Sequence, residues 1–592
     1  MTSPLIAQRP SSQTSSNEHE HGIEEEDALL TGQRTGKHSN HQSTSVNRSK
    51  WRELGLLIWA LVATTAVVVL AVVYQHSQAA TSRSEDGKPP SGKKNVIFMV
   101  SDGMGPTSLA LTRSWRQYAE GLPWAEILVL DEYLIGQSRT RSTSSLITDS
   151  AAGATAFSCG LKSYNGAISV LPNFDPCGSV MEAAKRKGYT TGLVVTTRIT
   201  DATPAVFVAH ARRREMEDDI ARQMIGEKHP LGRMVDLMFG GGRCHFLPGN
   251  AEGCRGDDVD VVDIAKNGSW GYIDSKKDFD KLGKSVNLPF LGLFAEHDIP
   301  YEIDRRYMED TYPSLEAMTK KALELLSAAT KDSEQGFFVM IEGSRIDHAG
   351  HANDPAAQVH EVLAYDRAMA AVLDFIKHED TPTLMVATSD HETGGLATAK
   401  QLHKEYPHYL WYPGVLANVS HSAAYTAHQY HSHQRDHSAS EDVRAWLQQL
   451  SAKALGIHDP SEAEINELIK DPVLAAYTFA DMISRRSQTG WSTHGHSGAD
   501  VNIYSSDPAL TTALRGNHEN TEVGEFLRHY LDLEDEVEVV TKKLREHMNS
   551  VGAEEYLGRI PDDGERLDGQ DHLDRYAGDH KTKRGLCELC GA

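Results

Sequence analysis

From residue 95 onward, the chain alternates between apolar runs typical of buried strands and longer segments with helical spacing. The strand-like runs are NVIFMV from Asn95, TTGLVV from Thr190, GFFVMI from Gly336 and TLMVAT from Thr383. An Ala-rich segment that begins at Ser150 and the segment 355–376 have the pattern of helices. This alternation predicts an α/β fold with a largely parallel central sheet flanked by helices.

The alternation predicts one main domain over residues 93–535, interrupted at 401–490 and followed by a charged segment, 536–592. We interpret 401–490 as an inserted surface subdomain and 536–592 as an acidic C-terminal appendage with a helix. The insert is rich in histidines: His403, His408, His421, His428, His431, His433 and His437. Their irregular spacing, with no acidic or Cys partner, favours solvated side chains, and a second metal site is the alternative.

Residues 54–75 predict a single transmembrane helix. The run Leu54–Tyr74 carries no charge and has about the 20 residues needed to cross a bilayer. Basic residues just before it, among them Arg48 and Arg52, favour a cytosolic N-terminus and a lumenal main domain. A cleaved signal peptide is the alternative, although about fifty residues precede the run.

The polar residues 1–53 predict a disordered cytosolic tail, and residues 76–92 a stem linker. Within the tail, Glu25 precedes Leu29 and Leu30 in an acidic dileucine pattern, which would bind a sorting adaptor complex. A chance leucine pair is the alternative.

The formal net charge is −24, from 59 basic and 83 acidic residues, which argues against nucleic acid as a partner. A small phosphorylated substrate stays possible, since bound cations reverse a local potential.

All six cysteines follow the predicted span, as expected in an oxidising lumen. Cys244 with Cys254 and Cys159 with Cys177 are candidate disulfides, while Cys587 and Cys590 favour a terminal disulfide or no bond. The sequons at Asn267 and Asn418 are candidate glycosylation sites.

The predicted strands end in side chains that bind metal ions. Asp102 follows the first, Glu342 the third, and Asp390 and His391 the fourth. In an open α/β sheet, ligands bind beyond the carboxyl ends of the strands, so these side chains can converge. So many buried carboxylates need cations, and the pattern therefore predicts a multi-metal hydrolase.

Two further segments supply candidate metal ligands and a candidate nucleophile. Asp347 and His351 are spaced i,i+4, so one helical turn would direct both at the same ion. Ser150 stands at the start of its Ala-rich helix, where free N–H groups and the helix dipole favour a phosphate, and is the candidate nucleophile.

With these motifs the chain resembles the alkaline phosphatase family, and its fungal membrane-anchored vacuolar members most of all. The resemblance covers roughly residues 93–530 and rests on segments that occur in the family's order. They are Asp102–Gly105, Thr148–Thr155, Asp201–Pro204, Glu342–His351 and Ser389–Gly395.

The resemblance implies a phosphoserine at Ser150, two zinc ions and one magnesium ion. The first zinc would be held by Asp347, His351 and His496, and the second by Asp102, Asp390 and His391. The magnesium site would contain Asp102, Asp201, Thr203 and Glu342. These hard oxygen ligands favour magnesium over zinc in the third site.

Three assignments depend on a choice between neighbours or on a variable position. The family pattern selects His496 over His494, and its spacing selects Arg214 over Arg212 and Arg213 as the phosphate-clamping arginine. His348 would contact the phosphate through water and shift the pH optimum.

The resemblance implies a phosphomonoesterase with an alkaline optimum, a broad substrate range and a homodimeric assembly. With the dileucine signal, it favours the vacuole membrane, with the plasma membrane as the alternative. Three other functions are less consistent with these residues. A phosphodiesterase of the same superfamily would lack the arginine clamp and the third metal site, and a sulfatase would need a Cys-x-Pro-x-Arg-type segment. A non-catalytic scaffold would not need every metal ligand of the family to be present.

Overall fold

The computed structural model describes residues 92–250, 253–436 and 442–562, with residues 59, 62, 64, 65, 90, 564, 565 and 567. The chain divides into two units, residues 1–85 and 86–592. The predicted tail with its dileucine pattern, nearly all of the stem, and Cys587 and Cys590 lie outside the described residues.

Of the predicted span 54–75, Trp59, Val62, Thr64 and Thr65 are described, each in helical conformation. No helix among the described residues is long and apolar enough to cross a membrane.

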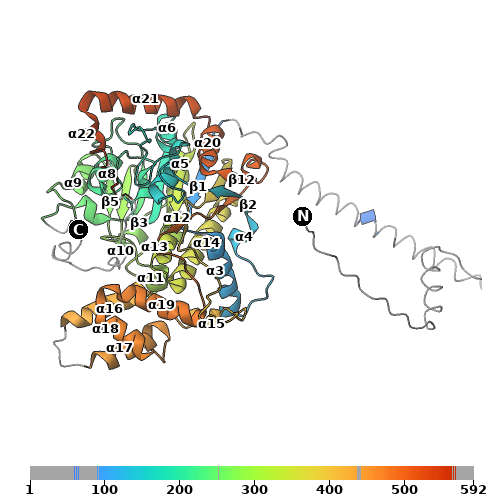
Figure 1. Ribbon diagram of the computed structural model, residues 1–592. Coiled ribbons are helices and arrows are strands. Elements are labelled where there is room, and N and C mark those ends of the chain that lie inside the picture. The colour runs from blue at the N-terminus through green and yellow to red at the C-terminus, as the bar shows by residue number, and fades with distance from the viewer. Residues whose placement is uncertain are drawn as a thin grey trace, which may run out of the picture. The chain divides into compact units, whose positions relative to one another are not determined.

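A ten-stranded sheet organises the second unit (Figure 1). In sheet order the strands are β12 (Gly516–Glu519), β2 (Leu134–Arg139), β11 (Val501–Ser505), β8 (Thr383–Thr388), β1 (Asn95–Val100), β7 (Phe337–Glu342), β3 (Thr190–Arg198), β4 (Leu237–Gly241), β6 (Phe290–Leu293) and β5 (Gly271–Ile273). Only β11 runs antiparallel to its neighbours, β2 and β8, among these described strands. The predicted largely parallel sheet is confirmed, and the four strand-like runs of the sequence are its central strands β8, β1, β7 and β3.

Helices fill the connections and cover the sheet. The α-helices of the first part are α3 (Pro106–Ala119), α4 (Val129–Glu132), α5 (Ser150–Cys159), α6 (Val180–Arg186), α7 (Ala202–Ala205), α8 (Glu217–Met224), α9 (Val261–Asn267), α10 (Lys276–Asp280), α11 (Glu302–Arg305), α12 (Leu315–Thr330), α13 (Arg345–His351) and α14 (Pro355–His378). Those of the second part are α15 (Pro413–Ala417), α16 (Ala423–Asp436), α17 (Val443–Leu455), α18 (Glu462–Lys470), α19 (Ala475–Ser487), α20 (Asn520–Tyr530), α21 (Glu534–Val551) and α22 (Ala553–Leu557).

Strand β1 shows why the central strands are mostly unbroken apolar runs in the sequence. Val96 and Phe98 point into one core cluster with residues of α5, α6 and α20. Ile97 and Met99 point into the opposite cluster with residues of α12 and α14. Because both faces of the sheet are buried, apolar residues follow one another along most of each central strand instead of occupying every second position.

The predicted insert 401–490 contains α15 to α19, and α16 to α19 lie together in Figure 1. Leu447, Leu468 and Phe479 belong to a third apolar cluster, which also takes residues from α13 and α14. The insert therefore packs against the elements that follow β7.

Helix α21 covers part of the predicted C-terminal appendage 536–592. Val537, Val540 and Leu544 are buried in the first core cluster, so this acidic helix is packed on the domain by its apolar face.

Candidate functional site

The polar residues that follow the four central strands meet at one edge of the sheet. Strands β8, β1, β7 and β3 are parallel neighbours, so their carboxyl ends lie side by side. The turn after β1 passes very close to α13: a Cβ on Gly103, whose φ is +76°, would lie 2.5 Å from Cα of Asp347. Glycine at this position therefore lets Asp102 and Asp347 approach each other.

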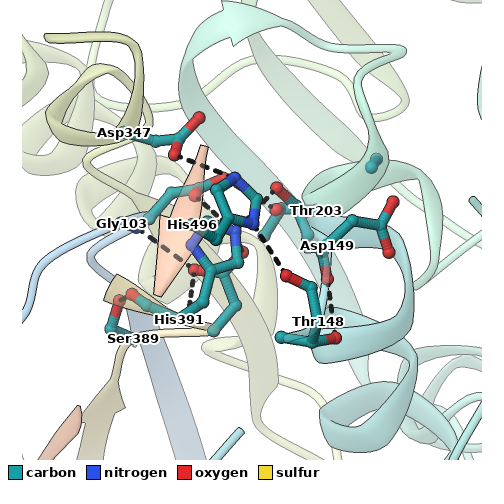
Figure 2. A network of polar contacts seen from close by, with 12 residues as sticks. Gly103, Thr148, Asp149, Thr203, Asp347, Ser389, His391 and His496 are labelled. Atoms are coloured by element: carbon teal, nitrogen blue, oxygen red, sulfur yellow. Dashed lines mark hydrogen bonds and ion pairs between the residues drawn. The ribbon is translucent and has the colours of Figure 1, made fainter. Parts of the chain in front are cut away.

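Asp347, His351 and His496 form the first group of candidate metal ligands. His351 Nε2 lies 3.2 Å from Asp347 Oδ2 and 3.1 Å from His496 Nε2. His496 comes from the short strand β10 (His496–Ser497), which pairs with β9 (Glu392–Thr393). The distant segment is thereby joined to the motif that follows β8 (Figure 2).

The hydrogen bonds of the two histidines assign their tautomers. His351 Nδ1 donates to the carbonyl oxygen of His494, and His496 Nδ1 donates to that of Thr148 at 2.7 Å. Both Nε2 atoms are then free of protons in the neutral rings, and their lone pairs face each other and the Asp347 carboxylate. Histidines that ligate metals have this arrangement, so the group fits a cation.

His494 does not enter this group. Its ring stacks on Tyr477 at 4.0 Å, and its Nδ1 donates to the carbonyl oxygen of His351 at 2.8 Å.

Asp102, Asp390 and His391 form the second group. His391 Nε2 lies 3.3 Å from Asp390 Oδ2 and 3.5 Å from Asp102 Oδ1. The hydroxyl of Thr393 donates to Asp347, and its oxygen lies 3.2 Å from His391 Nδ1. This contact places the ring proton on Nδ1 and leaves the Nε2 lone pair toward the two carboxylates.

Three buried carboxyl groups in this region are electrostatically uncompensated. Burial, reinforced by the neighbouring carboxylates, raises the pKa of Asp102 and of Glu342 well above the usual range. Burial and the charge of Asp347 raise the pKa of Asp390 to about 6. One oxygen of each group, Asp102 Oδ1, Glu342 Oε2 and Asp390 Oδ2, accepts no hydrogen bond. Bound cations would remove this cost, so these residues fit a metal centre.

Asp201, one of the predicted magnesium ligands, is engaged by two arginines. Its Oδ1 accepts from Arg214 and its Oδ2 from Arg198, each at 2.9 Å. Burial opposes ionisation, but these arginines hold the pKa of Asp201 below its usual range. Thr203 lies closer to the second group, since its hydroxyl donates to Asp102 Oδ2 at 3.2 Å.

Ser150 is the first residue of α5, and Asp149 caps that helix through a bond from the Ala152 N–H. The Ser150 hydroxyl lies 3.1 Å from His391 Nε2, which is free of a proton in the tautomer described above. The candidate nucleophile is therefore in direct contact with the second ligand group and at the positive end of a helix dipole.

The three consecutive arginines point in different directions. Arg214 donates to Asp149 Oδ2 at 3.1 Å and to Asp201, and it is buried. Arg212 donates to the carbonyl oxygen of Gly558, and Arg213 pairs with Glu565. Arg214 alone of the three binds carboxylates of the site in the described contacts.

His348 is buried beside this network. Its Nδ1 accepts from Arg345 Nε at 3.2 Å and lies 3.6 Å from Asp298 Oδ2. Burial lowers the pKa of His348 to about 4, so the ring is neutral at physiological pH.

Several residues that hold the ligands in place were not given a role by sequence reasoning. Thr393 bridges the two groups, Asp149 holds Arg214, and Arg198 holds Asp201. Thr393 and Asp149 lie inside the recognised motifs, which was their only sequence signal, and Arg198 had only its place at the end of β3.

Two other groups of potential ligands do not have the same properties. In the first, His210 and His229 both contact Glu182 Oε1, at 3.0 and 2.8 Å. His229 Nδ1 accepts from the Leu231 N–H, so its proton is on Nε2 and points at the glutamate. A protonated nitrogen cannot ligate a metal, and this group is an internal hydrogen-bonded network.

The second group consists of His245 with Cys244 and Cys254, and these two cysteines form a disulfide. Cys159 and Cys177 form the other predicted disulfide. Both sequon residues, Asn267 and Asn418, are exposed.

A parallel sheet that brings two such ligand groups and a serine to one edge defines a metal-dependent hydrolase of the α/β class. A family model described as "Alkaline phosphatase" matches residues 93–533. The repressible alkaline phosphatase of Saccharomyces cerevisiae is 49% identical over 518 residues, which cover 83% of this chain and 90% of the yeast protein. The alkaline phosphatase of Schizosaccharomyces pombe is 44% identical over 508 residues, covering 84% and 90%.

Two solved structures of alkaline phosphatases are similar to this chain in fold and sequence. The cold-active alkaline phosphatase of a Shewanella species has 32% identity and a TM-score of 0.61, covering 74% of this chain and 99% of its own. The enzyme of Thermus thermophilus has 26% identity and a TM-score of 0.64, covering 78% and 98%. The chain therefore belongs to the alkaline phosphatase family, and it is a metal-dependent phosphomonoesterase.

Proposed function

We propose that this chain hydrolyses phosphomonoesters through a phosphoserine at Ser150, with two zinc ions and one magnesium ion at the residues described above. The observation that carries the proposal is the 3.1 Å contact between Ser150 Oγ and His391 Nε2, which joins the serine to a group that fits a cation.

In the first half of the reaction, the oxygen of Ser150 attacks phosphorus and the bond to the alcohol oxygen breaks. The Ser150 hydroxyl faces the same His391 Nε2 lone pair that would hold a cation, so it would release its proton to solvent as its oxygen attacks, and the alcohol oxygen would take up a proton as it leaves. The N-terminus of α5 and the guanidinium of Arg214 compensate the charge of the phosphoryl oxygens, since an arginine fork matches two of them. In the second half, water attacks the same phosphorus and the serine oxygen leaves.

Zinc ions held by the two groups would lower the pKa of the attacking oxygen and stabilise the departing one. Because the residues of the site are directed at the phosphoryl group rather than at the alcohol, we expect a broad substrate range and an alkaline optimum.

The third site is proposed to bind magnesium through Asp102, Asp201, Thr203 and Glu342. The unpaired Glu342 Oε2 and the hard oxygen donors support this choice. A solved variant of the TAB5 alkaline phosphatase, in which a histidine is replaced by aspartate, has magnesium in a site named M3. We infer that Asp201 plays the part of that aspartate.

His348 is proposed to bind the phosphate through water and to influence the pH profile, since it lies beside the network of Arg198 and Asp298. His348→Ala is expected to move the pH optimum while the reaction stays the same. A pH–rate profile that coincides with wild type would reject this role.

The location, glycosylation and oligomeric state of the enzyme are also proposals. The predicted span and dileucine signal support a single-pass protein of the vacuole membrane, with a lumenal catalytic domain, N-glycans on Asn267 and Asn418, and adaptor binding by the tail. A homodimer is proposed from the family alone.

The test compares p-nitrophenyl phosphate hydrolysis and zinc content of the full-length protein in wild type, His496→Ala and His431→Ala. His431 is a matched control because it lies in the insert, where its Nε2 contacts the carbonyl oxygen of Pro472. We expect His496→Ala to lose zinc and activity and His431→Ala to keep both. Chelation should abolish the wild-type activity, and zinc with magnesium should restore it; activity that survives complete metal removal would contradict the proposal.

A further inference from the structure

The helical insert contacts the segment that carries His496. After α19, residues 490–496 return to the site and run beside the motif that follows β8. Gly490 pairs with Ala397, and the N–H groups of Ser492 and Thr493 both donate to the carbonyl oxygen of Gly394. These bonds fix one side of the segment, and the insert supplies the other.

A ring stack and a hydrogen bond join α19 to this segment. The ring of Tyr477 stacks on that of His494 with centroids 4.0 Å apart and an angle of 24°. Trp491 Nε1 donates to the hydroxyl of Ser484 at 3.0 Å. The Trp491 ring lies against Gly394, where a Cβ would approach it to 2.4 Å, so the indole is held between the insert and the β8 motif.

Asn353 joins the same segment to the end of α13. Its side-chain amide donates to the carbonyl oxygens of Gly350 and Thr493, at 2.8 and 2.9 Å. Its own carbonyl oxygen accepts from Ser484 at 3.2 Å. Asn353 therefore contacts α13, the His496 segment and the insert together.

These contacts converge on the first ligand group. The carbonyl oxygen of His494 accepts the Nδ1 proton of His351, and that bond places the proton of the neutral ring on Nδ1, so that Nε2 faces Asp347 and His496. The position of the His494 backbone thus determines both the orientation of His351 and the approach of His496, two residues further on. The second group, Asp102, Asp390 and His391, has none of these contacts among those described.

We propose that the insert positions the first metal-ligand group, with Tyr477, Ser484 and Asn353 as positioning residues that fix the segment 491–496 against α13. This inference rests on the proposed binding of zinc by Asp347, His351 and His496. It gives the insert a function in metal retention that its scattered histidines do not indicate.

The test measures zinc affinity of the full-length protein by competition with a chelator. Tyr477 is half-buried and lines a cavity of about 790 Å³, so its truncation leaves the surrounding core intact. We expect Tyr477→Ala to weaken the binding of one zinc ion by about 10-fold, at the lower end of the effect of removing a direct partner of a ligand, because Tyr477 acts on the ligands through His494. In a His496→Ala background, the same substitution should change zinc affinity by less than about twofold, because the group it supports is already lost.

Two further variants separate positioning from general damage. Tyr425 stacks on His421 at 4.0 Å in the same insert, without a described contact to a ligand, so Tyr425→Ala should retain zinc as wild type does. Asn353 has a φ of +54°, which glycine adopts readily, so Asn353→Gly removes the amide without adding backbone strain. We expect Asn353→Gly to weaken zinc binding as Tyr477→Ala does.

The outcomes are distinct. Wild-type zinc affinity in both Tyr477→Ala and Asn353→Gly would overturn this inference while leaving the proposed function intact. Equal losses from Tyr477→Ala with and without His496 would also overturn it, because the effect would not act through the first group. A wild-type protein that binds no zinc would reject the proposed function itself.

Discussion

The hydroxyl of Thr393 connects the two groups of candidate metal ligands. One hydroxyl donates to Asp347 of the first group and contacts His391 Nδ1 of the second. A single atom thus determines the orientation of a carboxylate and the tautomer of a histidine, so the two groups are coupled at this residue.

Thr393→Val keeps the shape of the side chain and removes the hydroxyl. Because Asp347 and His391 both lose a partner, we expect kcat/KM to fall by roughly 10- to 100-fold and zinc affinity to weaken. Thr393→Ser retains the hydroxyl and should stay within about threefold of wild type. Steady-state kinetics and zinc titration of both variants check this, and equal activities of the valine and serine variants would contradict the coupling.

Arg214→Ala tests the assignment within the arginine triplet. Removal of a two-donor fork to phosphate is expected to lower kcat/KM by about 100-fold, near 3 kcal/mol of transition-state binding. Arg213→Ala is the neighbouring control, since Arg213 pairs with Glu565 and should keep near-wild-type kinetics. A larger loss in Arg213→Ala than in Arg214→Ala would reverse the assignment.

Most of the candidate site could be predicted at this scale, because metal ligands and a serine nucleophile belong to compact motifs such as Glu342–His351. The residues behind them could not. Asp149, Arg198 and Asn353 act through contacts that only the fold creates. Asp149 lies inside the recognised motif Thr148–Thr155, but no pattern in the sequence gave any of the three a role.

At the scale of elements, the central strands were predictable because burial on both faces gives unbroken apolar runs. The strands on either side of these four were not predicted: β12, β2 and β11 on one side, and β4, β6 and β5 on the other. In β2, the residues LIGQSR are mostly exposed or half-buried, and β12 contains GNHE. Such strands are defined by their pairing partners rather than by their own pattern.

Helix α14 contains a buried carboxyl group that makes stability depend on pH. Burial raises the pKa of Glu361 to about 7, although its carboxylate accepts from the Glu302 N–H at 2.6 Å. Between its usual pKa near 4.5 and about 7, the folded protein binds more protons than the unfolded chain, so stability falls as pH rises through this window.

Glu361→Gln is expected to remove this part of the pH dependence. At 1.36 kcal/mol per pKa unit, the variant gains up to about 3 kcal/mol over wild type at pH 8 and nothing at pH 4. Denaturant unfolding of both proteins at the two pH values measures the difference. Parallel stability curves across that range would show that the pKa of Glu361 is not raised in the folded protein.

At the scale of the whole molecule, the metal ions are expected to contribute to stability as well as to catalysis. Three buried carboxyl groups with raised pKa values lie at the carboxyl ends of the central strands, and bound cations would offset the cost of their desolvation. A ligand present at about 100 times its Kd stabilises a folded protein by roughly 2.7 kcal/mol. Chelation should therefore lower the Tm of the catalytic unit, and zinc with magnesium should restore it. An unchanged Tm after verified metal removal would contradict this expectation.

The central claim is that Ser150 carries the phosphoryl group during turnover. The most direct measurement is mass spectrometry of the full-length enzyme, quenched in acid during hydrolysis of a phosphomonoester and digested to release the peptide that contains Ser150. We predict a phosphate on Ser150 in wild type, and neither this phosphopeptide nor appreciable hydrolysis in Ser150→Ala. Rapid turnover by the Ser150→Ala variant, or wild-type turnover with the phosphate on another residue, would contradict the account.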